Sequence, residues 1–245
     1  MIHYHGGPIT PTSVAERLWS GRHGFVSFEN PSQLPLVAEV CQSFALDNGA
    51  FTAWSTGKEL DVQGYVQWVN AWCRHPGFDF ALIPDVIDGS VQDNDIMICR
   101  FRDAGGDLIR SVPVWHMHEP IDRLERLCHA YQRVALGSSG EWSVVGSAEW
   151  WQRIAEAMDA ICDRNGQPPC KLHGLRMLNT EVFRYLPLSS ADSTNVARNH
   201  ARERKTYDLT EGMAALVMAS RIEQMNAASA WLRRFSVQYD MGISL

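Results

Sequence analysis

The stretch Ser43-Phe44-Ala45-Leu46-Asp47-Asn48-Gly49-Ala50-Phe51 joins a short apolar run to a loop of small and polar residues. The run has the length of a buried strand, and Asp-Asn-Gly is typical of a turn at which a strand ends. Far along the chain, Ser190-Ala191-Asp192-Ser193-Thr194-Asn195 has a similar arrangement. Each stretch places a carboxylate beside an apolar segment, so its meaning depends on how the intervening chain is organised.

Short apolar or β-branched segments alternate along the chain with segments whose apolar residues recur at helical spacing. The predicted strands are 2–6, 24–29, 43–46, 80–84, 111–116, 133–136, 170–175 and 186–191. The predicted helices between them include 12–20, 34–42, 62–74, 90–104, 121–131 and 148–164. The helix at 148–164 has the clearest pattern, because its apolar residues form one continuous stripe.

Strands that alternate with helices predict a parallel sheet, and eight such pairs favour a single (β/α)₈ barrel, an α/β fold. A doubly wound open sheet is the alternative. We expect one domain over residues 1–245 with C-terminal helices in 208–245. Two helices are predicted there, at 209–226 and 227–235, one as the eighth barrel helix and the other as an extension.

The composition is that of an ordinary globular protein, with 45% hydrophobic and 20% charged residues among 245. No apolar run reaches the roughly 18 residues of a membrane span. The start Met1-Ile2-His3-Tyr4-His5 has no basic segment and no apolar signal core, so we expect a cytoplasmic protein. The six cysteines show no CxC or CxxC spacing, and a structural zinc site is not indicated.

Charge is distributed unevenly. The net charge of −6 argues against a protein coated in basic residues for nucleic acid. Four cations nevertheless crowd together directly after the Asp192 stretch: Arg198, Arg202, Arg204 and Lys205. Such a strip beside a candidate active site could hold phosphates, and a solvated helix face or loop is the alternative.

Chemistry in a barrel of this kind sits at the carboxyl ends of the strands. The predicted strand ends carry acidic, glycine and histidine residues, among them Asp47, Asp85, His116, Gly137, Gly174 and Asp192. Each acid also has a structural interpretation. Asp47 fits a turn, and Asp85 and Asp192 fit helix caps. If one fold brings Asp47 and Asp192 together, they form the kind of carboxylate pair that cleaves and remakes a bond at a sugar carbon.

Several short motifs, in order between residues 47 and 199, resemble those of the tRNA-guanine transglycosylase superfamily. Asp47-Asn48-Gly49-Ala50-Phe51 is similar to the family's Asp-Ser-Gly-Gly-Phe element. The other similar stretches are Ala135-Leu136-Gly137, Lys171-Leu172-His173-Gly174-Leu175, Ala191-Asp192-Ser193 and Thr194-Asn195-Val196-Ala197-Arg198-Asn199. The chain looks most like the DNA-acting branch in bacteriophages and bacterial modification clusters, the DpdA-like proteins.

The resemblance implies a (β/α)₈ barrel that exchanges guanine in a nucleic acid for a 7-deazaguanine such as preQ0 or preQ1. By residue match, Asp192 would be the nucleophile at C1′, Asp47 the general acid and base, and Asp85 the reader of the base edge. The remaining predicted substrate-binding residues are Asn48, Phe51, His116, Gly137, Ser138 and Gly174. The nucleophile must be ionised, and Arg198 is expected to help keep it so.

Two departures from the family pattern shape the prediction. The zinc cluster of the tRNA enzymes is missing, which favours DNA over tRNA as substrate and leaves no metal or other cofactor in the prediction. The family's base-reading glutamine corresponds to His116. The expected partners are DNA (with tRNA as the alternative), the free 7-deazaguanine base, and either another protein or a second copy of the chain; no membrane is expected. A phage-encoded chain would act in the host cytoplasm.

Two other functions remain open at this point. A barrel N-glycosidase or nucleoside hydrolase would use the same carboxylates with water in place of the incoming base. A non-catalytic nucleic-acid-binding barrel would need the basic strip but neither Asp47 nor Asp192.

Overall fold

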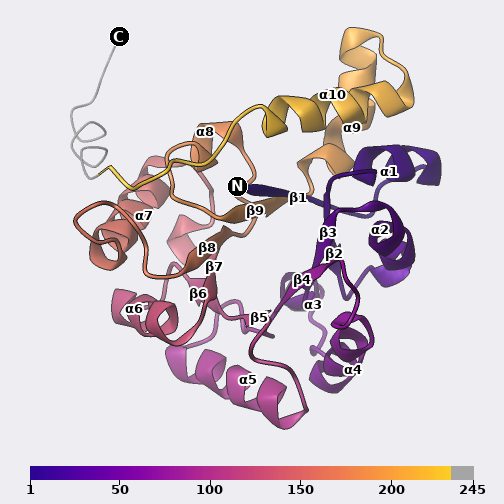
Figure 1. Ribbon diagram of the computed structural model, residues 1–245. Coiled ribbons are helices and arrows are strands. Elements are labelled where there is room, and N and C mark those ends of the chain that lie inside the picture. Colours follow the sequence, from indigo (N-terminus) through magenta and orange to yellow (C-terminus); the bar gives the residue numbers. More distant parts are fainter. Residues whose placement is uncertain (233–245) are drawn as a thin grey trace.

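Parallel strands form the wall of a barrel, and helices lie around it (Figure 1). The structure is a computed structural model that describes residues 1–232. Within that range the strand segments are β1 (Ile2–Gly6), β2 (His23–Ser27), β3 (Ser43–Asp47), β4 (Phe78–Leu82), β5 (Ser111–Val112), β6 (Val114–His116), β7 (Arg133–Gly137), β8 (Lys171–Gly174) and β9 (Ser190–Ser193).

The ring of strands closes through the segment that contains Pro113. The pairing order runs β5-β4-β3-β2-β1-β9-β8-β7-β6, with every pair parallel. β5 pairs with β4, whereas β6, directly after Pro113, pairs with β7. Proline has no N–H to donate, but its carbonyl accepts the Ala135 N–H at 2.9 Å. β5 and β6 therefore together form the predicted strand 111–116, and the eight-stranded barrel is confirmed.

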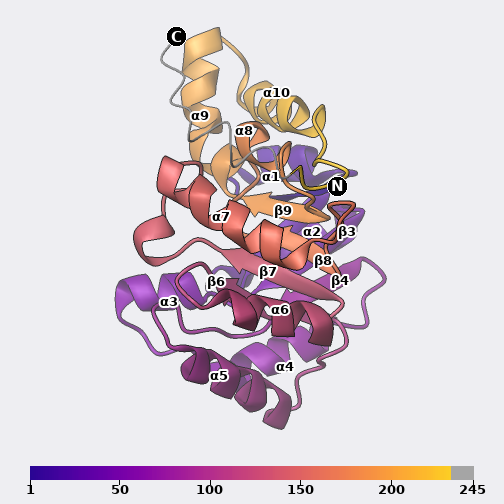
Figure 2. The same ribbon diagram turned by 90° about the vertical axis from the view of Figure 1, so that its left-hand side faces the viewer.

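Helices connect successive strands and cover the outside of the ring, as Figures 1 and 2 show. Through the described residues they are α1 (Thr12–Trp19), α2 (Leu34–Val40), α3 (Ala50–Thr56), α4 (Val62–Trp72), α5 (Val91–Asp103), α6 (Ile121–Ala130), α7 (Ala148–Ile161), α8 (Thr180–Phe183), α9 (Asn195–Tyr207) and α10 (Glu211–Glu223), with short 3₁₀ turns at Pro31–Gln33 and Gly140–Trp142. All six helices predicted between the strands are present.

The last part of the fold differs from the prediction in three ways. The predicted strand 186–191 begins later, at Ser190, so Asp192 lies inside β9 and not in the loop after it. The segment with the four basic residues forms the helix α9. Of the two structural alternatives, a helix face or a loop, the helix is therefore correct. The predicted helix 209–226 corresponds to α10, but residues 227–232 are irregular and 233–235 lie outside the described residues. The helical pair after β9 is thus α9 and α10, and α10 packs against α1 and α9.

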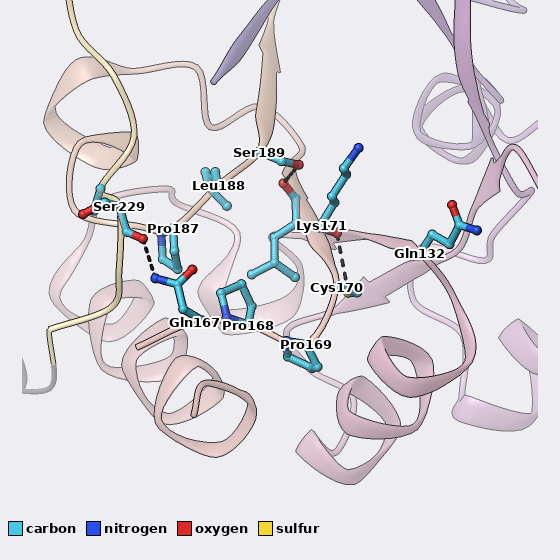
Figure 3. Close-up of a pocket in the computed structure, with 12 residues that line it drawn as sticks. Gln132, Gln167, Pro168, Pro169, Cys170, Lys171, Pro187, Leu188, Ser189 and Ser229 are labelled. Atoms are coloured by element: carbon cyan, nitrogen blue, oxygen red, sulfur yellow. Dashed lines mark hydrogen bonds between the residues drawn. The ribbon is translucent and has the colours of Figure 1, made fainter. Parts of the chain in front are cut away.

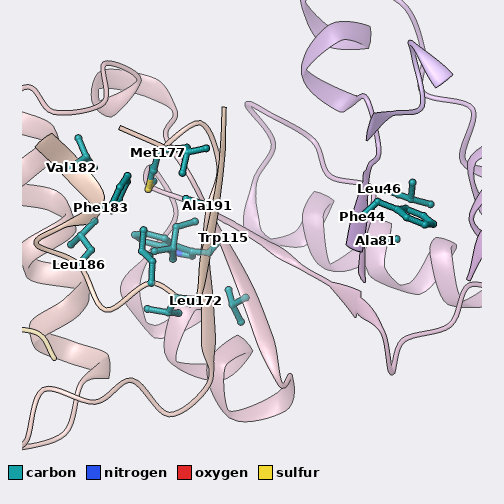
Figure 4. Packing of buried hydrophobic residues seen from close by; sticks show 14 of the residues in the cluster. Phe44, Leu46, Ala81, Trp115, Leu172, Met177, Val182, Phe183, Leu186 and Ala191 are labelled. Carbon is teal, nitrogen blue, oxygen red and sulfur yellow. The ribbon is translucent and has the colours of Figure 1, made fainter. Parts of the chain in front are cut away.

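Residue alternation along each strand separates two cores. On β3, Phe44 and Leu46 face outward into the large core between strands and helices, and Ala45 faces the barrel interior. Figure 4 shows Phe44, Leu46 and Ala81 on one side of that outer core. The interior holds a smaller cluster that includes Tyr4, Phe25 and Phe80. Because alternate residues share a face, Asp47 points to the interior, as Ala45 does.

A buried ion pair holds the loop after β6. The side chains of Glu119 and Arg123 are each 1% exposed and meet at 2.8 Å. Glu119 also accepts the backbone N–H of His116 at 2.9 Å and the side-chain amide of Asn94 at 3.0 Å. Asn94 in turn bonds both backbone groups of Val86, next to Asp85. This network ties the β4 and β6 loops together, and both loops carry site residues.

We expect Glu119→Ala to destabilise the protein by about 3 kcal/mol, because it removes the buried carboxylate partner of Arg123 and leaves that guanidinium only the half-exposed Asp95 as a counter-ion. Urea unfolding followed by circular dichroism measures this change. Glu156→Ala is the matched control. It breaks the pair between the exposed Glu156 and the largely buried Arg153, which keeps its hydrogen bonds to the Met117 and Glu119 carbonyls, and it should change stability by less than about 1 kcal/mol. Equal losses in the two variants would contradict this account of the network.

Candidate active site

A cavity of about 470 Å³ opens at the carboxyl ends of the strands. Nine of the predicted site residues line it: Asp47, Asn48, Phe51, Asp85, His116, Gly137, Ser138, Asp192 and Arg198. They come from β3, the β4 loop, β6, β7, β9 and two helices, so the fold gathers residues that are up to 151 positions apart (198 minus 47). The structure therefore brings the two acids of the opening stretches into one cavity.

Asp47 ends β3 on the interior side of the wall. Gly49 follows at φ 78°, a left-handed conformation, and a Cβ there would lie 2.7 Å from the Glu29 Cγ. This explains why a glycine ends the turn. Burial raises the pKa of the Asp47 carboxyl to about 7, and the charges of Asp192 and Asp85 add to the rise. The Ser27 hydroxyl and the Gly49 N–H act in the opposite direction. Asp47 can therefore gain and lose a proton near neutral pH.

Asp192 is 5% exposed and is oriented by groups on the neighbouring strand β8 and its loop. Its Oδ1 accepts the backbone N–H of Arg176 at 3.0 Å. The His173 Nε2 lies 3.4 Å from the same oxygen, and the His173 Nδ1 is 2.8 Å from the Ser190 hydroxyl. The expected ion pair from Arg198 to Asp192 does not occur among the described residues. Sequence reasoning missed the contact from Arg176, since a backbone N–H leaves no signal in residue identity.

Asp85 is held at both carboxylate oxygens. The Asn48 side-chain amide donates to Oδ1 at 2.7 Å, and the His116 Nε2 lies 2.8 Å from Oδ2. Asn48 itself is fixed, because it donates to the Ile83 carbonyl and accepts the Ala50 N–H. Asn48 and His116 thus act through Asp85 as well as lining the cavity. A carboxylate oxygen has more than one lone pair, so Asp85 keeps acceptor capacity toward a ligand.

Arg176 links three elements at the mouth, and the sequence analysis assigned it no role. Its guanidinium donates to the Ser138 carbonyl at 2.8 Å and lies 4.8 Å from the centre of the Phe51 ring. Its backbone has φ 59°, a left-handed conformation that strains a residue with a side chain. The same residue donates its backbone N–H to Asp192. The strain therefore accompanies a contact that orients the candidate nucleophile.

Two substitutions at Arg176 separate strain from side-chain contact. Both Arg176→Ala and Arg176→Gly remove the contacts with Ser138 and Phe51, but only glycine adopts φ 59° without strain. We expect the glycine variant to be more stable than the alanine variant by about 1 kcal/mol. Urea unfolding of the two variants measures the difference, and a more stable alanine variant would contradict the strain.

The two predicted glycines lie differently: Gly137 lines the cavity and Gly174 does not. A Cβ on Gly174 would lie 2.8 Å from the Cβ of Met177 and 2.9 Å from Leu188, so this glycine serves packing outside the cavity. A Cβ on Gly137 would lie 3.1 Å from the His116 Nδ1, which indicates close approach on the cavity side. The two glycines were predicted to play the same role, and their strand register places them differently.

The four predicted nucleic-acid-binding cations all lie on α9. Arg198, Arg202 and Lys205 follow spacings of four and three residues, which places them on one exposed helix face. Arg204 lies on the other side of α9 and is partly buried. Arg198 lines the cavity, whereas Arg202, Arg204 and Lys205 extend away from it along the helix. Among the described residues none of the four pairs with a carboxylate.

Across residues 1–232, no group of three or more His, Cys, Asp or Glu side chains is arranged to hold a metal ion. Over the same residues, no helix has the length and apolar character needed to cross a bilayer.

A second hollow, of about 600 Å³, lies at the opposite end of the barrel (Figure 3). Pro168, Pro169 and Pro187 border it, and the Gln167 side chain donates to the Ser229 carbonyl at 2.7 Å. None of its lining residues is acidic. The amino-terminal face of such barrels serves stability, so the cavity at the carboxyl ends of the strands is the candidate active site.

Comparison with known proteins identifies no family for this chain. No family model matches the chain, and no curated protein matches it. Among solved structures, the tryptophan synthase alpha subunit of the hyperthermophile Pyrococcus furiosus aligns over 91% of this chain and 95% of that chain, with 13% identity and a TM-score of 0.47. Two single-substitution variants of that subunit give TM-scores of 0.46 and 0.48 at 11% and 12% identity. The barrel is therefore defined by the chain's own strand pairing.

Proposed function

We propose that this protein is a base-exchange glycosyltransferase that replaces guanine in DNA with a 7-deazaguanine through a covalent aspartyl-sugar intermediate. One observation carries the proposal. Three carboxylates, Asp47, Asp85 and Asp192, converge on one cavity, and each has a different environment. Carboxylates that share a site but differ in surroundings can take different chemical roles.

Asp192 is suited to attack the sugar. In the first step its carboxylate oxygen bonds to C1′ as the C1′–N9 bond to guanine breaks, and the bonding electrons leave with the base. The Arg176 N–H at 3.0 Å holds the carboxylate in one orientation for this attack. The ester keeps the sugar on the enzyme after guanine departs, and exchange without hydrolysis requires this step.

Asp47 is suited to move the proton. With a pKa raised to about 7, it can protonate the departing guanine and be left as a carboxylate. It can then take the N9 proton of the incoming base as that nitrogen attacks C1′ and the ester to Asp192 breaks. The carboxyl group returns to its starting state, so the cycle balances with no other reactant.

Asp85 is suited to read the base. Its oxygens can accept from the N1–H and the exocyclic amine of guanine, a donor pair that adenine does not offer. Asn48 and His116 fix both oxygens in place. A site that must hydrogen-bond such groups rejects analogues that lack them, because its own buried polar atoms would stay unpaired. A 7-deazaguanine keeps the same edge and would enter the same site.

Charge and the missing zinc-cluster sequence favour DNA as the substrate polymer. Arg198 at the cavity and the other cations of α9 offer phosphate contacts. The sequence has no zinc cluster of the tRNA-acting enzymes, which favours DNA. In a duplex the target guanine must leave the stack to reach the cavity.

One assay tests the proposal. The protein is incubated with DNA, or separately with tRNA, that carries labelled guanine, with and without preQ0 or preQ1. Repeated release of label that requires the added base supports exchange, because without the base the proposed first step frees at most one guanine per enzyme molecule. Repeated release without added base would instead indicate an N-glycosidase, and binding without release from either polymer would indicate a non-catalytic protein. Either of those two results overturns the proposal.

A further inference from the structure

An exposed aromatic pair lies on α3 at the rim of the cavity. Phe51 is 46% exposed and Trp54 is 49% exposed, and their ring centroids are 5.6 Å apart. A spacing of three residues places both rings on one side of the helix. Large apolar side chains are favoured inside a protein, and neighbouring exposed ones at a cavity rim indicate a binding surface.

The two rings differ in how they are held. Phe51 lines the cavity and lies under the Arg176 guanidinium. Trp54, in contrast, contacts no ring other than Phe51 within residues 1–232, and in that range its indole N–H has no hydrogen-bond partner. Phe51 is therefore part of the cavity wall, whereas Trp54 presents an open aromatic face next to it.

Two cations come from segments near this pair. Lys58 follows Trp54 by four residues, is exposed, and has no ion pair among the described residues. Arg198, on α9, lines the same cavity as Phe51. Figure 2 shows α3 at the left edge of the molecule and α9 rising at the upper left, with the start of β1 on the opposite side. Aromatic and basic groups thus share the carboxyl-terminal side of the barrel.

We propose that Trp54 stacks on the base next to the target guanine in an unpaired stretch of DNA, while Lys58 and the α9 cations hold the flanking phosphates. This inference rests on the proposed function, because it concerns how the same cavity receives its substrate. Removing guanine from the stack deprives its neighbour of a stacking partner. An open indole beside the cavity supplies a replacement plane, and any base can use it.

Charge selects this occupant over others. A single strand of nucleic acid combines aromatic faces with regularly spaced negative charges, which matches an open indole beside cations without carboxylate partners. Because stacking tolerates every base, the subsite requires that a neighbouring base be present and does not read its identity.

The test measures binding, with turnover removed by Asp192→Asn. The probe is a fluorescently labelled single-stranded oligonucleotide of about seven nucleotides with a central guanine, a length within the usual range of such sites. Companion probes carry an abasic residue, called the gap below, directly 5′ or directly 3′ of the guanine.

The expected result depends on Trp54. With Trp54 present, we expect the gap on one of the two sides to weaken binding about tenfold. In the Trp54→Ala background the intact probe should bind about tenfold more weakly, and the gap should have no further effect. Trp54→Phe should restore the effect of the gap.

Ile109→Ala is the matched control, since Ile109 is an exposed apolar residue just before β5, away from the cavity lining. It should bind all probes as Asp192→Asn alone does. Unchanged affinity in Trp54→Ala, or the same effect of the gap with and without Trp54, overturns the stacking subsite. Label release by the protein with Asp192 intact is scored separately, so the subsite can fail while exchange is observed, and exchange can fail while the subsite is observed.

Discussion

Replacing Asp192 by alanine is expected to lower base-dependent release of labelled guanine by roughly 10⁴-fold or more, because the sugar then has no nucleophile to hold it. Asp192→Asn should lose activity to the same degree, since the amide keeps the shape of the side chain but not its charge. The measurement is the steady-state rate of label release from excess DNA with the incoming base present.

A second readout ties the loss to covalent chemistry. Wild-type protein mixed with DNA in the absence of incoming base should form a complex that survives denaturing electrophoresis, and neither Asp192 variant should form it. Thermal unfolding of the variants checks that they are still folded, so that a loss of activity can be assigned to the missing carboxylate. Full activity in Asp192→Ala would show that another group attacks the sugar.

The second large effect concerns Asp47 and stability. Its pKa is about 7 in the folded protein against an ordinary value of 3.8, so the folded state binds the proton more tightly than the unfolded state does. Stability from this group is fully present below about pH 4 and is lost as pH rises toward 7. Asp47→Asn removes the titration. We therefore expect the variant to be more stable than wild type by roughly 2–4 kcal/mol at pH 8 and equal to it near pH 4.

Urea unfolding across that pH range measures the difference, which should grow with pH and level off above 7. Glu59→Gln removes one exposed carboxylate with no ion pair among the described residues, and as the matched control it should stay within about 0.5 kcal/mol of wild-type stability. The same Asp47→Asn variant should be nearly inactive in base exchange, because it can neither give nor take the proton. A variant that gained stability and kept activity would remove Asp47 from the proposed mechanism.

The barrel could be predicted from the sequence because its signals are local. Apolar runs that end in polar residues and helices with apolar stripes are properties of neighbouring residues. The positions of Asp47, Asp85 and Asp192 near strand ends followed from the same patterns. Element boundaries were less accurate: β9 begins later than predicted, because Leu186 and Leu188 are apolar residues that pack into the outer core without joining the sheet.

The end of the chain shows the same limit. α9 is rich in charged residues, so apolar periodicity gave no reason to predict a helix there. In 227–232, Trp231 is buried although the segment is not helical, and its backbone N–H donates to the Gly166 carbonyl at 2.8 Å. Tertiary contacts of this kind override local preference, since burial can be reached by any backbone conformation that satisfies its hydrogen bonds.

By itself, the sequence of this protein determined which residues alternate between core and barrel interior, and therefore the ring of parallel strands and the acids at its carboxyl end. The hydrogen-bond partners and the protonation behaviour of each acid depend on the tertiary structure. The N–H of Arg176 on Asp192, the hold of Asn48 and His116 on Asp85, and the raised pKa of Asp47 all join segments distant in the chain. The physical reason is that hydrogen bonds and desolvation depend on distances of a few ångströms across the barrel, which residue order does not encode directly.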